Sequence, residues 1–406
     1  MAAMTVTAPA GASAGQLVRL LAPLGYVATL VGLIASFVSP FLPLFLSRVL
    51  HAGPVRISLF LFLMPLAAVV VATVVGRVSD RPGARPRVLL VGALAGIAGY
   101  LLFAVFRNYW AALAVALSLV AVAGSLLPQV FAFSRGLLDR ASPARAAAGI
   151  NALRAVFSLS WVAGPPLAAY LIGAVDFAGL YLVAAAMHLA ILPVLLWFGG
   201  RGGAPRTATH ATPAPAAAPP RRGRLVRISA AFVLMQCAAS LGVMSLSLFV
   251  SEDLRGDVGD AGLVLGICAA VEIPLMLLFG ALATRWSLRR LVLVGGVLGV
   301  GYFLAMAATT GLWQVAVAQL LNACFIATVG GLGISYFQDL MPGLLGRATT
   351  MFTNSQRISA MLAGLVFGAV QLLGYRSAYL LGAVLCAAGL ALLAADRPLP
   401  ADLNGA

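Results

Sequence analysis

Long apolar segments follow one another along almost the whole chain and are separated by short polar turns. A helix needs about 20 apolar residues to cross a membrane, and the alternating ten-residue segments typical of a membrane barrel do not dominate here. The pattern therefore predicts twelve spanning helices. They cover residues 20–47, 57–76, 88–106, 109–133, 147–173, 178–198, 228–250, 261–284, 291–309, 312–337, 348–373 and 376–395.

The longest polar stretch, residues 199–227, separates the twelve segments into two groups of six. It contains the run PAPAAAPP and several arginines, a composition typical of a flexible linker. We therefore expect an all-α integral membrane protein with a disordered N-terminus (1–19), a first six-helix bundle (20–198), this linker, a second bundle (228–395) and a tail (396–406). The linker and both ends are predicted to be cytoplasmic.

Two loops of similar sequence lie half a chain apart. The first runs from Gly76 to Arg87 and reads GRVSDRPGARPR, and a weaker copy, GALATRWSLRR, begins at Gly280. Gly76 and Gly280 are 204 positions apart, which indicates a duplicated helical bundle.

A second motif, an asparagine followed three residues later by an arginine, also occurs twice inside predicted helices. It comprises Asn151 and Arg154 in the fifth segment and Asn354 and Arg357 in the eleventh, displaced by 203 positions. Two unrelated motifs with nearly the same offset support a duplication. Parallel repeats that flank a midplane site are the architecture of one large class of transporters.

The composition agrees with a membrane protein, because 62% of the residues are hydrophobic and only 9% are charged, against roughly 25% charged in soluble proteins. The net charge of +15 comes with 26 arginines and no lysine. Nineteen of these arginines fall on the side of the predicted membrane that holds both chain ends. This bias marks the cytoplasmic side, so we expect no nucleic-acid partner.

Other chemistry has little support in the sequence. The four cysteines lie inside apolar segments and the three histidines lack metal-ligand spacing, so neither a disulfide framework nor a metal is expected. There is no signal-peptide pattern, no GxxxxGK[ST] nucleotide loop and no catalytic set typical of an enzyme. We expect no cofactor, with a proton gradient as the energy source.

Three charged side chains lie inside predicted helices: Glu272, Arg154 and Arg357. A charge at the centre of a spanning helix costs about 2.5–3.5 kcal/mol even on the mildest scale, so these residues should face an interior cavity. Glu272 is predicted to be a protonatable carboxylate that couples transport to protons, with the two arginines in the same pathway. The alternatives are a static ion pair between Glu272 and one arginine, or arginines that extend to the cytoplasmic surface.

Uncharged polar side chains also gather inside the predicted helices. Amides and a tryptophan can hydrogen-bond and stack a sugar-like ligand, although amides between helices also form structural hydrogen bonds worth about 0.6 kcal/mol each. The predicted substrate-binding residues are Gln129, Asn151, Trp161, Gln236, Gln319, Asn322 and Asn354.

A face of small residues in the fifth segment surrounds Gly164, Pro165 and Pro166, with Ser160 one turn earlier. Small residues allow helices to approach closely. The face either seals the two halves against leakage or is an ordinary helix contact.

The loop at Gly76 resembles the signature loop of the major facilitator superfamily, and it lies between segments 2 and 3 as it does there. In the second copy, Thr284 and Ser287 replace the aspartate and the second glycine. The resemblance implies that the first loop is a gating element. Its matching residues are Gly76, Asp80, Arg81, Gly83 and Arg85.

Several stretches more narrowly resemble the bacterial sugar efflux transporters of that superfamily. They are LFLSR (44–48), LPQVFAFSR (127–135), SLSWVAGPPLA (158–168), VEIP (271–274) and YFQDLMPGLLGRATTMFTNS (336–355). The resemblance implies a monomeric inner-membrane carrier with the major facilitator fold. This carrier would expel sugars or glycosides against protons by alternating access.

The same resemblance implies an arrangement of the segments. Segments 1, 4, 7 and 10 would line the cavity, and segments 5 with 8 and 2 with 11 would meet between the halves. Asp80 would latch the cytoplasmic side. Two alternatives remain: a multidrug or secondary-metabolite exporter, and a non-transporting membrane sensor or enzyme.

Overall fold

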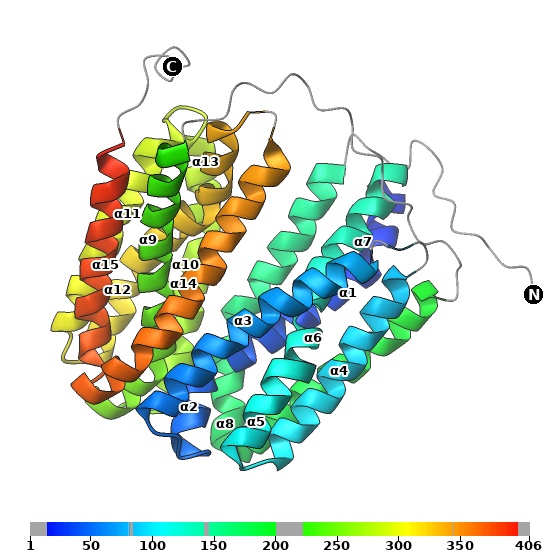
Figure 1. Ribbon diagram of the computed structural model, residues 1–406, viewed down its shortest axis with the longest axis horizontal. Coiled ribbons are helices and arrows are strands. Elements are labelled where there is room, and N and C mark those ends of the chain that lie inside the picture. The colour runs from blue at the N-terminus through cyan, green and yellow to red at the C-terminus, as the bar shows by residue number, and fades with distance from the viewer. Residues whose placement is uncertain are drawn as a thin grey trace, which may run out of the picture. The chain divides into compact units, whose positions relative to one another are not determined.

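The computed structural model describes residues 14–79, 81, 84–141, 146–199, 222–342 and 344–396, which form helices and turns without a strand (Figure 1). The predicted linker core and most of both terminal segments lie outside the described residues. The largest differences from the sequence ranges are that α1 begins at Ala14, α9 begins at Arg222 and α7 ends at Ala141. A spanning helix can continue past its apolar stretch because its backbone hydrogen bonds are satisfied internally.

The helices run as follows. Those of the first half of the chain are α1 (Ala14–Val38), α2 (Leu42–Arg48), α3 (Pro54–Ser79), α4 (Arg85–Val105), α5 (Tyr109–Val115), α6 (Ala121–Ala123), α7 (Leu126–Ala141) and α8 (Ala146–Gly199). Those of the second half are α9 (Arg222–Leu248), α10 (Val258–Leu282), α11 (Leu288–Ala308), α12 (Leu312–Phe325), α13 (Gly333–Leu340), α14 (Leu345–Leu373) and α15 (Arg376–Ala394).

Eleven stretches of the described chain are long and apolar enough to cross a membrane. The longest, Gly149–Phe198, has 50 residues and contains a break, because Val175 and Asp176 leave the helical conformation and Asp176 has a φ of 63°. With a φ of 63° and a ψ of 178°, Asp176 has a backbone conformation that residues other than glycine rarely adopt. Two helices therefore lie within α8, and the twelve crossings predicted from the sequence are confirmed.

Polar side chains cap the N-termini of two of the apolar helices. The Asn108 side chain accepts hydrogen bonds from the backbone N–H groups of Trp110 and Ala111 at 2.9 and 3.2 Å. Asp257 and Asp260 form a reciprocal capping box at the start of α10. These caps satisfy donors that a helix leaves unpaired at its N-terminus.

The chain divides into two compact units. Unit 1 comprises residues 1–39 and 66–211, and unit 2 comprises residues 40–65 and 212–406. Residues 40–65, which precede much of unit 1 in sequence, therefore pack with unit 2.

In unit 1, α1 and α8 approach closely through small side chains. The Ser36 hydroxyl donates to the carbonyl of Ser160 at 3.2 Å, and the Ser160 hydroxyl donates to the carbonyl of Thr29 at 3.1 Å. A side-chain carbon added at Gly164 would collide with Ser36, and one added at Gly32 would collide with Ser160. The small-residue face of segment 5 thus forms a helix contact inside unit 1, in agreement with the packing interpretation.

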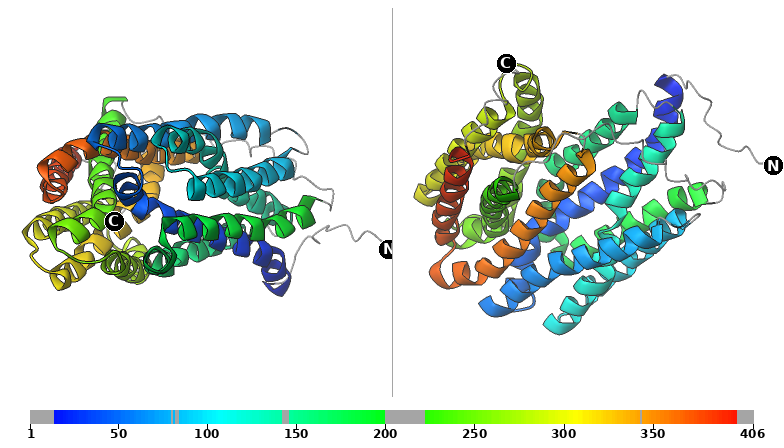
Figure 2. Two further views of the ribbon diagram at one scale, coloured as in Figure 1. Left: turned by 90° about the horizontal axis from the view of Figure 1, so that it is seen from below. Right: turned by 45° about the horizontal axis from the view of Figure 1, so that its top comes forward.

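In unit 2, α9 lies beside both α14 and α15 (Figure 2). The Ser359 hydroxyl on α14 donates to the carbonyl of Val233 on α9 at 2.9 Å. Val233 and Thr29, the two backbone acceptors, are 204 positions apart, the offset that also separates the two loop glycines. Both units thus join the corresponding helices through a serine hydroxyl, although the donors Ser160 and Ser359 are 199 positions apart and lie one turn off the repeat.

The first part of α3 packs on α14 within unit 2. The Ser58 hydroxyl donates to the carbonyl of Leu365 at 3.0 Å and accepts from the backbone N–H of Gly368 at 2.7 Å. A side-chain carbon at Gly364 would lie 2.5 Å from the carbonyl of Leu61, so the two backbones touch only because glycine is present. Segments 2 and 11 thus meet, as the resemblance implied.

Candidate functional site

A cluster of buried polar side chains lies inside unit 2, between α10, α11 and α12. Asn322 donates to the Gln319 amide oxygen at 2.9 Å and to the Cys268 sulfur at 3.4 Å. The Tyr302 hydroxyl lies within hydrogen-bonding reach of Gln319. Gln319 is fully buried and Asn322 nearly so. The predicted ligand residues Gln319 and Asn322 are therefore hydrogen-bonded to each other, and Asn322 also to Cys268.

Glu272 lies one helical turn beyond Cys268 on α10, so both side chains project from the same face of the helix. Its side chain is half-buried. Within the described part of unit 2, the Glu272 carboxylate has no ion pair and no hydrogen bond. A static pair with Arg357, one alternative from the sequence, is therefore not formed in this structure.

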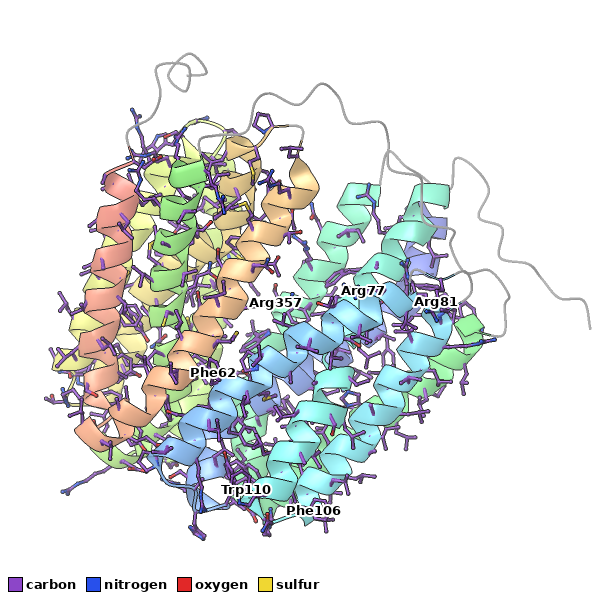
Figure 3. The ribbon with its side chains drawn as sticks, in the orientation of Figure 1. Phe62, Arg77, Arg81, Phe106, Trp110 and Arg357 are labelled. Atoms are coloured by element: carbon purple, nitrogen blue, oxygen red, sulfur yellow. The ribbon has the colours of Figure 1, made fainter. Side chains whose placement is uncertain are left out.

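Arg357 lies well away from both ends of α14 (Figure 3). Its side chain is half-buried, and Asn354 on the preceding turn is exposed. Gln236 on α9 is 8% exposed, and its amide nitrogen has no hydrogen-bond partner among the described residues. Gln236 is thus a buried donor that remains free to bind a ligand or water.

The candidate residues of unit 1 occupy two helices. Gln129 on α7 is buried, and its amide oxygen finds no hydrogen-bond partner in the described part of the chain. On α8, Asn151 and Arg154 are exposed and Trp161 is half-buried. The predicted substrate residues thus fall in both units, and unit 2 gathers only Gln319 and Asn322 into direct contact.

The loop between α3 and α4 is only partly described, and Asp80 and Gly83 lie outside the described residues. Gly76 is half-buried in the last turns of α3, and Arg81 is exposed. Arg85 begins α4 and donates to the carbonyl of Ala132 at 3.5 Å. Figure 3 shows Arg77 and Arg81 at one end of the unit 1 helices and Phe106 and Trp110 at the other.

Neither loop glycine is required by packing in this structure. A side-chain carbon added at Gly76 or at Gly280 would meet no described atom within 4 Å. The small size at both positions must therefore serve something other than the helix contacts described here.

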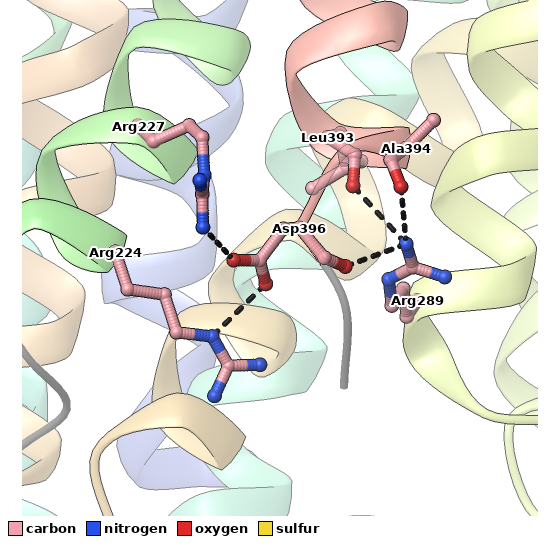
Figure 4. Close-up of polar contacts among 6 residues, drawn as sticks. All are labelled: Arg224, Arg227, Arg289, Leu393, Ala394 and Asp396. Atoms are coloured by element: carbon pink, nitrogen blue, oxygen red, sulfur yellow. Dashed lines mark hydrogen bonds and ion pairs between the residues drawn. The ribbon is translucent and has the colours of Figure 1, made fainter. Parts of the chain in front are cut away.

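Three arginines and one aspartate join the ends of α9, α11 and α15 (Figure 4). The buried Asp396 carboxylate accepts from Arg224 at 2.9 Å and from Arg227 at 2.6 Å. Arg289 donates to the carbonyls of Leu393, Ala394 and Asp396 at 3.2, 3.0 and 2.7 Å.

This clasp was not found by sequence reasoning, which placed Asp396 in a tail. The signal that could have found it is the spacing of Arg224 and Arg227, three apart on one helix face, with an acid just after the last apolar segment. A cation at the C-terminus of α15 also complements the helix dipole. The clasp is therefore structural.

At the opposite end of unit 2, a single arginine, Arg376, joins several elements. The Arg376 guanidinium donates to the carbonyls of Ala307 and Thr309, the latter at 2.9 Å, and lies 5.6 Å from the Phe249 ring centroid. The Arg376 backbone N–H donates to the Asp253 carboxylate at 3.1 Å. Among the described residues, no group of three His, Cys, Asp or Glu side chains could hold a metal ion.

The fold and these clusters define a polytopic helical membrane protein made of two repeated units. The chain matches the model of the Major Facilitator Superfamily over residues 24–249 and 228–406. A structure of the nucleoside transporter NupG superposes with a TM-score of 0.78 at 15% identity, covering 93% of this chain and 100% of that one. A peptide transporter of the POT type in complex with sulfate gives 0.77 at 15% identity, covering 96% of each chain.

Proteins more similar in sequence narrow the family. A putative sugar efflux transporter of Deinococcus radiodurans is 37% identical over 379 residues, or 91% of this chain and 96% of the relative. Sugar efflux transporter A of Escherichia coli is 31% identical over 373 residues, 91% and 94% of the two chains. The chain therefore belongs to the Major Facilitator Superfamily and, within it, to the bacterial sugar efflux transporters. It is a transporter and not an enzyme.

Proposed function

We propose that this protein exports sugars or glycosides across the bacterial inner membrane in exchange for protons. The two units expose a central site alternately to each side, and both chain ends face the cytoplasm. The names of the relatives support a sugar substrate, and the concentration of arginines on one side supports the orientation.

The observation that carries the proposal is an unpaired carboxylate beside a cluster of amides. Glu272 is the fourteenth residue after the start of α10, at a depth of about 21 Å along the helix axis, inside a hydrocarbon layer about 30 Å thick. An ionisable group at that depth without a fixed partner can gain and lose a proton when its surroundings change. Amides such as Gln319 and Asn322 suit the hydroxyl groups of a sugar, because each amide both donates and accepts.

A second candidate is the export of amphipathic cations. An unpaired carboxylate in an apolar bundle attracts a positive charge, so Glu272 also supports this alternative. Under either substrate, Glu272 gains and loses the proton that drives export, and Arg154 and Arg357 belong to the same proton pathway.

The loop at Gly76 acts as the gate in this proposal. The open space around Gly76 and Gly280 supports a gating role. Packing in this conformation does not require glycine at either position, whereas a close contact formed in another conformation would require it. Asp80 then holds the cytoplasmic side closed.

The test is transport by the purified protein in liposomes with an imposed pH gradient. Glu272→Gln should lose gradient-driven export of labelled glycosides but retain exchange of labelled for unlabelled substrate, which moves no net proton. Glu252→Gln is the matched control, because Glu252 is exposed at the end of unit 2. Gradient-driven export by Glu272→Gln at the wild-type rate would contradict the role of Glu272, and export of a cationic dye alone would favour the second candidate.

A further inference from the structure

Two hydroxyl groups of fully buried residues near one end of unit 2 have no partner among the described residues. The hydroxyls of Tyr379 on α15 and Ser245 on α9 are both inaccessible, and no described residue forms a hydrogen bond with either. A buried polar group without a partner is costly, and such groups in protein interiors are usually satisfied by internal water.

Tyr379 and the turn of α9 that contains Ser245 both lie near Tyr302. A side-chain carbon added at Gly242, one turn before Ser245, would lie 3.9 Å from the Tyr302 hydroxyl and 3.9 Å from the Tyr379 ring. The Tyr302 and Tyr379 rings are 6.4 Å apart, edge to face. Water bound to Tyr379 and Ser245 would therefore adjoin the Tyr302 hydroxyl, which already reaches Gln319.

The same groups form a column that extends from the exposed Asp253 at one end of unit 2 towards Glu272. Arg376, whose backbone binds the Asp253 carboxylate, lies one turn before Tyr379. Measured along their own helices from that end of unit 2, Tyr379 lies about 5 Å deep, Tyr302 about 9 Å and Cys268 about 15 Å, with Glu272 at about 21 Å. Gln319 and Asn322 bridge the interval between Tyr302 and Cys268.

We infer that this column is a water-filled proton route through the interior of unit 2, from Asp253 to Glu272. The inference rests on the proposed function, because it supplies the proton that Glu272 exchanges. The hydroxyls of Tyr379, Ser245 and Tyr302 bind the water chain, and the amides of Gln319 and Asn322 orient it.

The proton balance of the route is simple. Each water or hydroxyl accepts a proton on the Asp253 side and releases one on the Glu272 side, so none of them changes its net charge. The amides move no proton. The net result is one proton lost from the solution at Asp253 and one O–H bond formed on the Glu272 carboxylate.

Removal of single hydroxyls tests the route. Tyr379→Phe and Ser245→Ala should each slow proton-driven export about tenfold, the rate equivalent of one lost hydrogen bond, while exchange of labelled for unlabelled substrate stays unchanged. Retained exchange shows that the variants fold. Matched controls are Tyr375→Phe, whose hydroxyl accepts from Gln371, and Ser229→Ala, near the other end of α9. Neither control should slow proton-driven export.

Hydroxyl-radical footprinting of the purified protein tests the water itself. Radicals formed from bound water should modify Tyr379, whereas Tyr181, which is equally buried in unit 1, stays unmodified. An unmodified Tyr379, or proton-driven export unaffected in both hydroxyl variants, would overturn the route. A wild-type protein that exports substrate without moving protons would instead contradict the proposed function.

Discussion

At the scale of single residues, two acids of unit 2 show opposite solutions to the cost of a charge in a membrane protein. Asp396 is fully buried and binds two arginines at 2.9 and 2.6 Å. Glu272 is half-buried and has no partner in the described part of unit 2. A fully paired carboxylate holds helices in place, whereas an unpaired one is free to change its protonation state.

The role of Asp396 gives a stability prediction. Asp396→Asn should lower the free energy of unfolding by ~1.5–3 kcal/mol, because it weakens the charge-assisted hydrogen bonds that Arg224 and Arg227 donate to this carboxylate. Thermal unfolding in detergent measures the loss.

The matched control for this prediction is Asp176→Asn in unit 1. The Asp176–Arg107 pair spans 3.9 Å between exposed side chains, and such pairs contribute little. Asparagine also keeps a side-chain oxygen that can accept from the backbone N–H of Phe177, as Asp176 does at 2.6 Å. Equal losses in the two variants would contradict a structural clasp at Asp396.

At the scale of elements, the contact between α3 and α14 depends on glycines. Gly364→Ala should destabilise the protein by about 1–3 kcal/mol, because the added carbon would lie 2.5 Å from the Leu61 carbonyl and force the helices apart. Thermal unfolding measures the loss of stability, and gradient-driven export measures the effect of the altered helix contact on transport.

Gly173→Ala in α8 provides the control for Gly364→Ala. A side-chain carbon at Gly173 meets no described atom within 4 Å, and alanine is the better helix former, so this variant should be as stable as the wild type or slightly more so. An unchanged melting temperature for Gly364→Ala would show that α3 and α14 can separate without cost.

At the scale of the whole molecule, the duplication accounts for the helical scaffold, whereas the carboxylate that we propose to exchange protons lies in unit 2 alone. The position that matches Glu272 at an offset of 204 is Ala68. The clasp of Asp396 and the column below Tyr379 also lie in unit 2, while unit 1 contributes the better-preserved loop at Gly76.

The orientation of the molecule gives a further prediction. In a background without the four native cysteines, Thr310→Cys in the α11–α12 turn should react with a membrane-impermeant maleimide in intact cells. Trp286→Cys in the α10–α11 turn should react only after permeabilisation, because Arg285, Arg289 and Arg290 mark that turn as cytoplasmic. The reverse labelling pattern would place both chain ends outside.

The number and order of the helices follow from the sequence alone, because a spanning helix satisfies its own backbone and shows itself as a local run of apolar residues. The same locality let the sequence reveal the duplication and single out Glu272, since a charge inside such a run is conspicuous. The break at Asp176 was likewise marked by an acid between two apolar segments.

Which side chains meet is a matter that only the tertiary structure decided. Asp396 and Arg224 are 172 positions apart, and Tyr302 and Tyr379 lie on helices that are not consecutive, so no local pattern pairs them. No local pattern shows the packing of residues 40–65 with unit 2 either, because it depends on the close approach of two backbones at Gly364; only the family resemblance implied that segments 2 and 11 meet. Apolar runs determine where a helix crosses the membrane, whereas its neighbours are chosen by the shapes of the faces that pack together.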